Sequence, residues 1–203
     1  MKNVVLYATD TMSDWEYGYL VAGLAMAEAQ MPGRYRLRVL GAPGKQTVRT
    51  LGGLGLLVDG AVTEAAIADT AVLVLPGAET WESGHEEVLD LARRCLAAGV
   101  PVAGICGATF GLARIGLLDD RAHTSNAPEF LAASGYGGAS RYREEKTVVD
   151  RQLITAPATA PVDFARAVFE ALELFPAPII EAWHGLYTTG ERRYFDQLMG
   201  AGA

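Results

Sequence analysis

The sequence predicts an α/β protein with a doubly wound, mostly parallel sheet that carries helices on both faces. Short continuous apolar runs, typical of strands buried on both sides, alternate with segments whose apolar residues recur at helical spacing. The chain has 203 residues, of which 50% are hydrophobic, enough for one large domain without disulfides or a structural metal. In an open sheet of this kind, ligands bind beyond the carboxyl ends of the strands.

Each element follows from a local pattern that ends at a Gly, Pro or polar residue. The predicted main strands are the apolar runs at residues 3–8, 35–40, 71–75 and 100–105. The predicted helices show apolar residues on one face, at residues 15–30, 88–96, 108–115 and 162–174. Weaker β patterns predict a small hairpin from residues 47–50 and 56–59, and short pieces at residues 122–125, 147–149 and 153–155.

The chain divides into two parts after the last long helix. Residues 1–175 hold the alternating strands and helices and are predicted to form the main domain. Residues 176–203 carry several aromatic side chains and are predicted to form a helical C-terminal extension, with two short helices separated at Thr189-Gly190.

Composition narrows the class of partner and the compartment. Lys and Arg number 17 against 24 Asp and Glu, so the net charge is 17 − 24 = −7, which disfavours nucleic acid and anionic membranes. No segment reaches the roughly 18 apolar residues of a membrane span. Two cysteines are too few for a disulfide framework, and phosphate-loop, dinucleotide and zinc motifs are absent. We expect a cytoplasmic protein with a small-molecule substrate and neither a cofactor nor a metal.

Cys106 is the candidate nucleophile. It lies in Gly104-Ile105-Cys106-Gly107-Ala108, where a predicted strand passes directly into a helix, and small residues on both sides permit the tight turn called a nucleophile elbow. Such a turn exposes the sulfur at a helix N-terminus, which favours a thiolate and predicts a lowered pKa for Cys106. The alternative is a buried structural cysteine. Cys95 lies within a predicted helix and is typical of a small apolar filler.

Glu16 begins the first helix in Ser13-Asp14-Trp15-Glu16, and two interpretations compete. In a capping box, Ser13 is the N-cap and the Glu16 side chain bonds back to its backbone N–H, and the local pattern alone favours this. Alternatively, Glu16 reaches the strand-end crevice, where a protonated carboxyl donates to the Cys106 thiolate or acts as general acid and base.

Backbone donors and further side chains complete the candidate site. Gly77-Ala78 follows a strand at the same sheet edge, so its N–H groups, with that of Gly107, are candidates for an oxyanion hole. Trp81 either lines the pocket or packs in the core. Among the three histidines, His123 is the candidate partner of Cys106, whereas His85 begins a surface helix and His184 belongs to the extension.

Taken together, these motifs resemble the DJ-1/PfpI superfamily, the class I glutamine amidotransferase-like group with a flavodoxin-like fold. The resemblance covers about residues 2 to 175. It depends on the first strand with Trp15-Glu16 and on the segments at residues 72–78, 103–110, 116–124 and 158–165. It implies that Cys106 is a nucleophilic, oxidation-sensitive cysteine and Glu16 its acidic partner, with backbone oxyanion donors at Gly77, Ala78 and Gly107.

The sequence also departs from the pattern of this superfamily. Members of protease type and many of glyoxalase type carry a histidine directly after the nucleophile, but Gly107 stands there. Glutamine amidotransferases need a late His-x-Glu pair, and His184 is not followed by Glu two residues later. His123 falls where some members place a pocket histidine. Protease activity of the Cys-His type and glutaminase activity are therefore disfavoured.

Three functional hypotheses follow. The first is a cysteine-thiolate enzyme for a small carbonyl or amide substrate, of hydrolase, amidase, glyoxalase or deglycase type. The second is a non-catalytic redox or stress-response protein in which Cys106 is reversibly oxidised. The third is a binding module whose thiol has ordinary reactivity. The resemblance further implies a homodimer.

Overall fold

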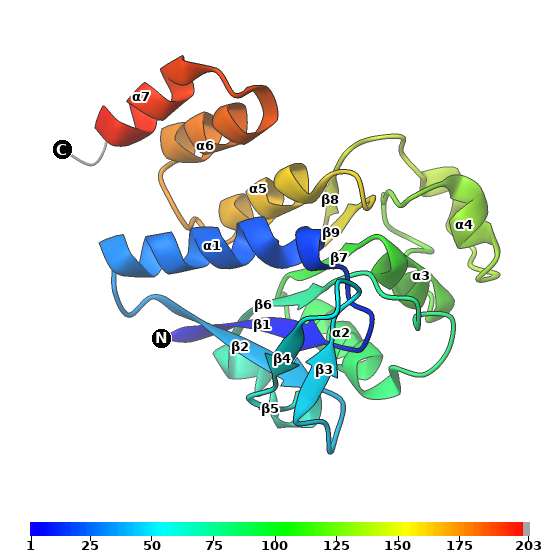
Figure 1. Ribbon diagram of the computed structural model, residues 1–203. Coiled ribbons are helices and arrows are strands. Elements are labelled where there is room, and N and C mark those ends of the chain that lie inside the picture. Colours follow the sequence, from blue (N-terminus) through cyan, green and yellow to red (C-terminus); the bar gives the residue numbers. More distant parts are fainter. Residues whose placement is uncertain (201–203) are drawn as a thin grey trace.

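A seven-stranded sheet forms the middle layer of the protein in this computed structural model, which describes residues 1–200 (Figure 1). The strand order is β5-β2-β1-β6-β7-β9-β8, and only β8 runs antiparallel to its neighbour. The strands are β1 (Lys2–Ala8), β2 (Tyr35–Gly41), β5 (Gly60–Ala61), β6 (Thr70–Leu75), β7 (Val102–Ile105), β8 (Val148–Asp150) and β9 (Leu153–Ala156). The predicted mostly parallel sheet is confirmed.

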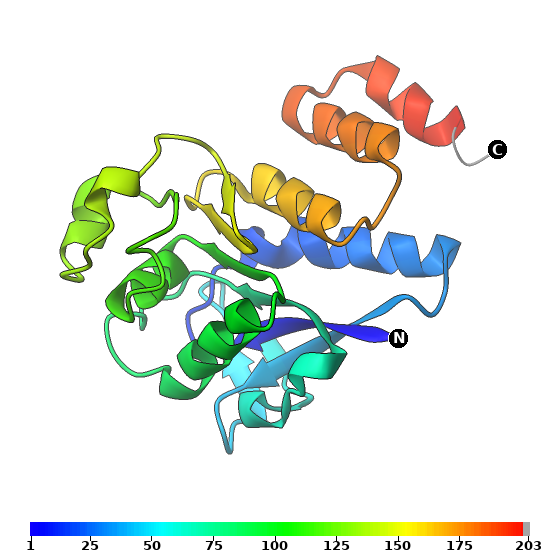
Figure 2. The same cartoon turned by 180° about the vertical axis from the view of Figure 1, so that it is seen from behind.

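Helices cover both faces of this sheet, as predicted (Figures 1 and 2). One face is covered by α1 (Asp14–Gln30) and α5 (Pro161–Ala171), and the other by α2 (Glu86–Ala97) and α3 (Gly107–Arg114). Strand β1 divides its side chains between the two layers, because successive residues of a strand point to opposite faces. Val4 and Leu6 join the first hydrophobic cluster, whereas Val5 and Tyr7 join the second.

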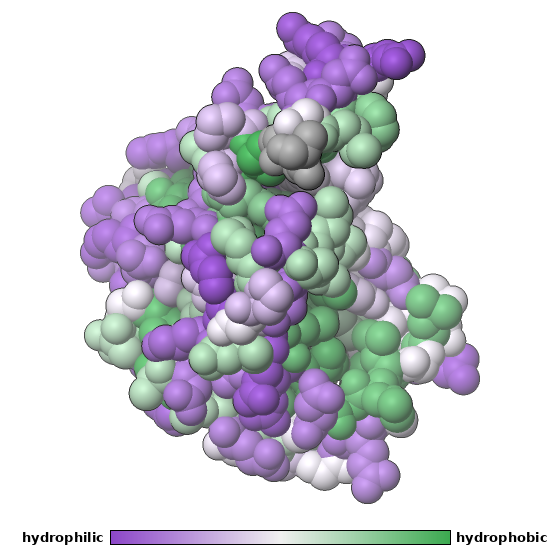
Figure 3. Space-filling model, turned by 90° about the vertical axis from the view of Figure 1, so that its left-hand side faces the viewer, coloured by the Kyte–Doolittle hydropathy of each residue, from purple (hydrophilic) through white to green (hydrophobic). Residues whose placement is uncertain are grey.

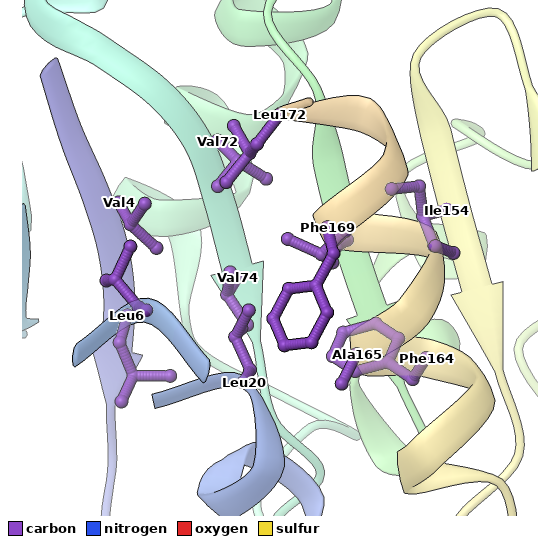
Figure 4. Packing of buried hydrophobic residues seen from close by; sticks show 14 of the residues in the cluster. Val4, Leu6, Leu20, Val72, Val74, Ile154, Phe164, Ala165, Phe169 and Leu172 are labelled. Atoms are coloured by element: carbon purple, nitrogen blue, oxygen red, sulfur yellow. The ribbon is translucent and has the colours of Figure 1, made fainter. Parts of the chain in front are cut away.

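The core between the sheet and α5 is built from aromatic and branched side chains. In Figure 4, Phe169 of α5 lies next to Val74 of β6, whereas Phe164 lies beside Ala165, on the side of Ile154 of β9. Helix α1 approaches α5 closely because Gly23 faces the Phe169 ring, where an added Cβ would lie 2.3 Å from Cζ. This packing fixes the N-terminal turn of α1 at the edge where the strands end.

The C-terminal extension adds two helices on the outer side of α5. These are α6 (Ala177–Thr189) and α7 (Arg192–Gly200), separated by Gly190, whose φ of 71° ends α6 in the left-handed region. Trp183 of α6 is buried, and its ring lies 4.8 Å from that of Phe169 between centroids. The top of the molecule, formed by α7, is largely hydrophilic in Figure 3. The predicted helical tail is therefore present and packs onto the main core.

Several shorter elements differ from the prediction. Residues 122–125 form no strand, and only an isolated bridge joins His123 to Tyr142. The predicted hairpin forms from β3 (Thr47–Arg49) and β4 (Gly55–Leu57). The sequence patterns did not predict helix α4 (Pro128–Ala132) or the 3-10 turns at Val62–Glu64, Ile67–Asp69 and Ala139–Arg141. Elements of three to five residues are too short to leave a periodic pattern. No helix within residues 1–200 is both long enough and apolar enough to cross a membrane.

Candidate active site

Cys106 occupies a strained turn between β7 and α3. Its backbone has φ 56° and ψ −124°, and its N–H donates to the Ala156 carbonyl at 2.9 Å. Small neighbours permit this turn: a Cβ on Gly104 would lie 2.7 Å from Leu112 Cδ1, and one on Gly107 would lie 2.8 Å from the Ala78 oxygen. The strand-to-helix position and the positive φ of Cys106 confirm the elbow predicted from the sequence. Such strained backbone angles persist only where the surrounding structure holds them.

Glu16 reaches the same place from the first turn of α1. Its side chain is completely buried, and Oε2 accepts the backbone N–H of Gly77 at 2.5 Å. A Cβ on Gly77 would lie 2.9 Å from both Cys106 Sγ and Glu16 Oε2, so the glycine lets thiol and carboxyl approach each other. The Ser13 side chain makes no capping hydrogen bond to the helix. The capping box is therefore not formed, and Glu16 lies in the strand-end crevice, while its role as proton donor or general acid and base stays a prediction.

The electrostatics of this pair differ from the prediction for the thiol. Burial raises the pKa of Glu16 to about 7, although hydrogen bonds from Gly77 and Cys106 oppose the rise. Burial, followed by the charge of Glu16, also raises the pKa of Cys106, which corrects the predicted lowering. The cost of desolvating a thiolate outweighs the donors at the helix N-terminus. Protonation of Glu16 removes the repulsion, so the two groups titrate as a coupled pair.

Asn126 is a site residue that the sequence analysis missed. Its side-chain Nδ2 donates to Cys106 Sγ at 3.3 Å, and its Oδ1 accepts the backbone N–H of Ala158 at 2.9 Å. The signal in the sequence that could have indicated this role is an amide side chain directly after Ser125, three residues beyond His123. Asn126 is 20 residues from Cys106 in the chain and lies in a segment without regular structure, so no periodic pattern in the sequence predicts this contact.

The predicted oxyanion donors are only partly available. The Gly77 N–H is already donated to Glu16, which corrects its assignment as a donor to substrate. Ala78 N lies 3.2 Å from the position of a Cβ on Gly107, so these two residues adjoin. Within residues 1–200 the Ala78 N–H has no hydrogen-bond acceptor, and the Gly107 N–H faces the Cys106 thiol. Ala78 and Gly107 remain as a backbone pair beside the sulfur.

His123 does not lie against Cys106. Its ring is buried, with Nδ1 hydrogen-bonded to the Arg121 carbonyl at 2.8 Å and Nε2 to the Tyr136 hydroxyl at 3.1 Å. Both nitrogens are therefore occupied away from the sulfur. The predicted pairing fails because the segment turns the imidazole into the packing around Tyr136 and Tyr142.

Trp81 and the other two histidines also serve in packing. The Trp81 indole is buried, donates to the Pro76 carbonyl at 2.9 Å and stacks on His85 with ring centroids 4.3 Å apart. Of its two predicted roles, the structure has the packing one. His184 bonds to Asp163 of α5 at 3.0 Å. No imidazole in the described part of the chain bonds to Cys106, and Cys95 is fully buried in α2.

Residues 1–200 contain no group of three or more His, Cys, Asp or Glu side chains placed to hold a metal ion. The chemistry available at the elbow is therefore that of a thiol, a carboxyl with a pKa near neutrality, one amide side chain and two backbone N–H groups.

Comparisons with known proteins identify the family and the fold. Residues 2–171 match the model of the DJ-1/PfpI family. The chain is 36% identical over 202 residues to "Uncharacterized protease YoaZ" of Bacillus subtilis, covering 98% of this chain and 96% of that protein. A thiJ/pfpI family protein from Bacillus anthracis has a TM-score of 0.91 and 35% identity, with 98% and 96% of the two chains covered.

A second solved structure extends the likeness. A DJ-1 superfamily protein from Agrobacterium tumefaciens superposes with a TM-score of 0.81 at 31% identity, covering 94% of this chain and 99% of that one. Family membership is supported by a family match over most of the chain, by relatives above 30% identity, and by a strained cysteine at the end of β7. This chain belongs to the DJ-1/PfpI family.

Proposed function

We propose that this protein is a cysteine-dependent enzyme that acts on a small carbonyl or amide substrate, of hydrolase, amidase, glyoxalase or deglycase type. The observation that carries the proposal is the contact of the buried Glu16 carboxyl with the strained Cys106 thiol across Gly77. A carboxyl with a pKa of about 7 can both accept and donate a proton at neutral pH, which is what a general acid and base must do.

The chemical steps follow from this pair. The thiol proton passes to the Glu16 carboxylate, and the Cys106 thiolate attacks the substrate carbonyl carbon, so that a C–S bond forms and the carbonyl oxygen becomes an oxyanion. We assign the stabilisation of that oxygen to the N–H groups of Gly107, which faces the sulfur, and of Ala78, which adjoins Gly107. With an amide, Glu16 returns its proton to the leaving nitrogen as the C–N bond breaks.

The remaining steps restore the enzyme. Water loses a proton to Glu16 and attacks the thioester, and Cys106 leaves as the thiolate with the acid as product. With a 2-oxoaldehyde, the first attack gives a hemithioacetal, whose oxygen takes the proton held by Glu16. The Glu16 carboxylate then removes the proton on the hemithioacetal carbon and returns it to the neighbouring carbonyl carbon, so that a 2-hydroxyacyl thioester forms, and water cleaves this thioester as above. Both routes begin with the same transfer from Cys106 to Glu16 and need no imidazole.

The substrate class is narrowed by what surrounds the sulfur. The two Bacillus subtilis relatives carry the name of uncharacterized proteases. In this chain no described histidine bonds to Cys106, and the residue after the nucleophile is Gly107. A protease mechanism of the Cys-His type is therefore disfavoured, and small substrates that need only one carboxyl for proton transfer are favoured.

Turnover of methylglyoxal and of a panel of small amides tests the proposal. The wild type is compared with Cys106→Ser, and Cys95→Ser serves as the matched control because Cys95 is buried in α2. We expect turnover in the wild type and in Cys95→Ser, and its loss in Cys106→Ser. Equal rates in all three proteins, or none above background, would contradict an enzyme of this kind.

A redox role is the second candidate, favoured by the donors around the sulfur. Glu16, Gly107 and Asn126 surround Cys106 with groups that can stabilise an oxidised sulfur. The thiolate attacks a peroxide oxygen, the O–O bond breaks, and a sulfenic acid forms with release of water or alcohol. Peroxide titration with peptide mass spectrometry tests this: Cys106 should oxidise well before Cys95 and recover with a thiol reductant. Equal oxidation of the two would exclude the role.

The proposal also includes a small-molecule partner, a cytoplasmic location and a homodimer. A chain with a net charge of −7 offers no general attraction for nucleic acid or anionic lipid. Light scattering after size exclusion should give about twice the chain mass of 21.6 kDa. A single-chain mass at micromolar concentration would remove the homodimer and leave the chemistry of Cys106 unchanged.

A further inference from the structure

Asn126 holds its amide in one orientation beside the nucleophile. Its Oδ1 accepts the backbone N–H of Ala158 at 2.9 Å, and a backbone N–H can only donate. The oxygen of the amide must therefore face Ala158, so the nitrogen must face Cys106 Sγ, 3.3 Å away. The sulfur receives an N–H donor whose direction is set by a different segment of the chain.

The partner segment is itself fixed at the mouth of the site. The Trp15 indole Nε1 donates to the Ala158 carbonyl at 3.2 Å, and Trp15 directly precedes Glu16 in α1. Both backbone groups of Ala158 are thus bonded, one to Asn126 and one to Trp15. These contacts join the first turn of α1 to the loops after α3 and β9, beside Cys106.

The Asn126 amide is a hydrogen-bond donor to Cys106 that, unlike Glu16, does not depend on pH. The titratable group that faces Cys106 is Glu16, which can donate to the sulfur only while it is protonated. An amide does not titrate, so its N–H remains a donor at every pH at which the protein is folded. The Gly107 N–H is the other permanent donor, but it belongs to the backbone of the elbow.

We infer that Asn126 is a catalytic residue of this site, a fixed N–H donor that stabilises negative charge on Cys106 Sγ and on the oxygen of an attacked carbonyl. The inference rests on the proposed function, because it assigns Asn126 to the same nucleophile. Donation to a charged acceptor is stronger than donation to a neutral one, so the contact favours the thiolate over the thiol. Asn126 and Glu16 then divide the work, with Asn126 stabilising charge and Glu16 moving the proton.

Two substitutions separate this role from a structural one. Asn126→Asp keeps the shape and the oxygen that accepts the Ala158 N–H, but it places a carboxylate oxygen where the donor was. Asn126→Leu removes both hydrogen bonds at similar volume. A carboxylate beside the sulfur also repels a thiolate, so Trp15→Phe, which removes the hydrogen bond from the Trp15 indole to Ala158 and adds no charge, is the control for the loop. If Asn126 only holds the Ala158 loop, Trp15→Phe should slow labelling as much as Asn126→Leu does. If Asn126 stabilises the thiolate, Asp should be the more damaging change.

The measurement is the rate of iodoacetamide labelling of Cys106 at pH 8 in the full chain, resolved from Cys95 by peptide mass spectrometry. We expect about a tenfold lower rate in Asn126→Leu, corresponding to one hydrogen bond to a charged sulfur, and a still lower rate in Asn126→Asp. Wild-type labelling in Asn126→Asp, with or without slowing in Asn126→Leu, would overturn the inference. Cys95 is fully buried, so its labelling reports unfolding in each variant.

The same proteins distinguish the failure of this inference from the failure of the proposed function. Absence of turnover in the wild type, with labelling rates in the order wild type, Leu, Asp, would remove the enzyme and leave Asn126 as the donor. Turnover in the wild type without that order would leave the enzyme and remove Asn126 from its chemistry. Asn126→Ala replaces Asn126→Leu if the larger apolar side chain prevents folding.

Discussion

Glu16 and Gly77 are joined by a 2.5 Å hydrogen bond from a backbone N–H to a buried carboxyl, although 61 residues separate them in the chain. This one contact places the carboxyl beside Cys106 and withdraws the Gly77 N–H from any role in binding substrate. A side chain at Gly77 would require neighbouring atoms to move, because Cys106 and Glu16 occupy the space that it would need.

Gly77→Ala should therefore damage the site and the fold together. The new Cβ would lie 2.7 Å from Cys106 Cβ and 2.9 Å from Glu16 Oε2, so either the thiol or the carboxyl must move. We expect loss of turnover and a decrease of about 1 to 3 kcal/mol in the free energy of unfolding. Gly18→Ala is the control, because nothing lies within 4 Å of its added Cβ in α1. It should keep activity and gain up to about 1 kcal/mol.

Glu16→Gln should change how stability depends on pH. The folded pKa of Glu16, about 7, is above its ordinary value of 4.5, so the folded state holds this proton more tightly than the unfolded state. The stabilising contribution is complete below pH 4.5 and is lost as pH rises through 7. Glutamine does not ionise, so the wild type should lose up to about 3 kcal/mol relative to Glu16→Gln over this range.

Urea unfolding of both proteins at pH 4.5, 6 and 8 measures this difference. Glutamine can still accept the Gly77 N–H, so the hydrogen bond itself is preserved in the variant. Parallel pH profiles of unfolding free energy for the two proteins would contradict a raised pKa at Glu16.

His123→Gln should weaken the fold without changing Cys106. Both ring nitrogens of His123 are bonded, to Arg121 and Tyr136, and the ring is fully buried. Loss of buried hydrogen bonds should cost about 1 to 3 kcal/mol of unfolding free energy. The rate of iodoacetamide labelling at Cys106 should remain within twofold of wild type at pH 8. A tenfold lower rate in a folded variant would restore His123 as the partner of the thiol.

Trp183→Ala should destabilise the whole molecule and not only the C-terminal extension. Its buried ring contacts Phe169 of α5, which belongs to the central hydrophobic cluster. We expect a loss of about 3 to 5 kcal/mol and a single unfolding transition by circular dichroism and by fluorescence. Tyr187→Ala is the matched control in α6, because Tyr187 is half-exposed and should cost less. A separate early transition, with the main one unchanged, would mean that α6 and α7 unfold independently.

The sequence by itself determined the fold class and the strained turn at Cys106. Continuous apolar runs and helical spacing are local patterns, and the small residues around Cys106 report the tight turn directly, so strands, helices and elbow could be predicted. The position of Glu16 just after the first strand brought it to the correct edge of the sheet, because parallel strands end on the same side.

Only the tertiary structure decided which contacts the side chains at that edge make and in which direction the pKa of Cys106 shifts. Asn126 reaches Cys106 and Ala158 across 20 and 32 residues, and His123 turns toward Tyr136 instead of the sulfur. Such contacts depend on how irregular loops pack, which leaves no periodic signal in the chain. The pKa of Cys106 likewise rises where the helix N-terminus alone predicts a decrease, because burial and a neighbouring carboxylate exist only once distant segments are folded together.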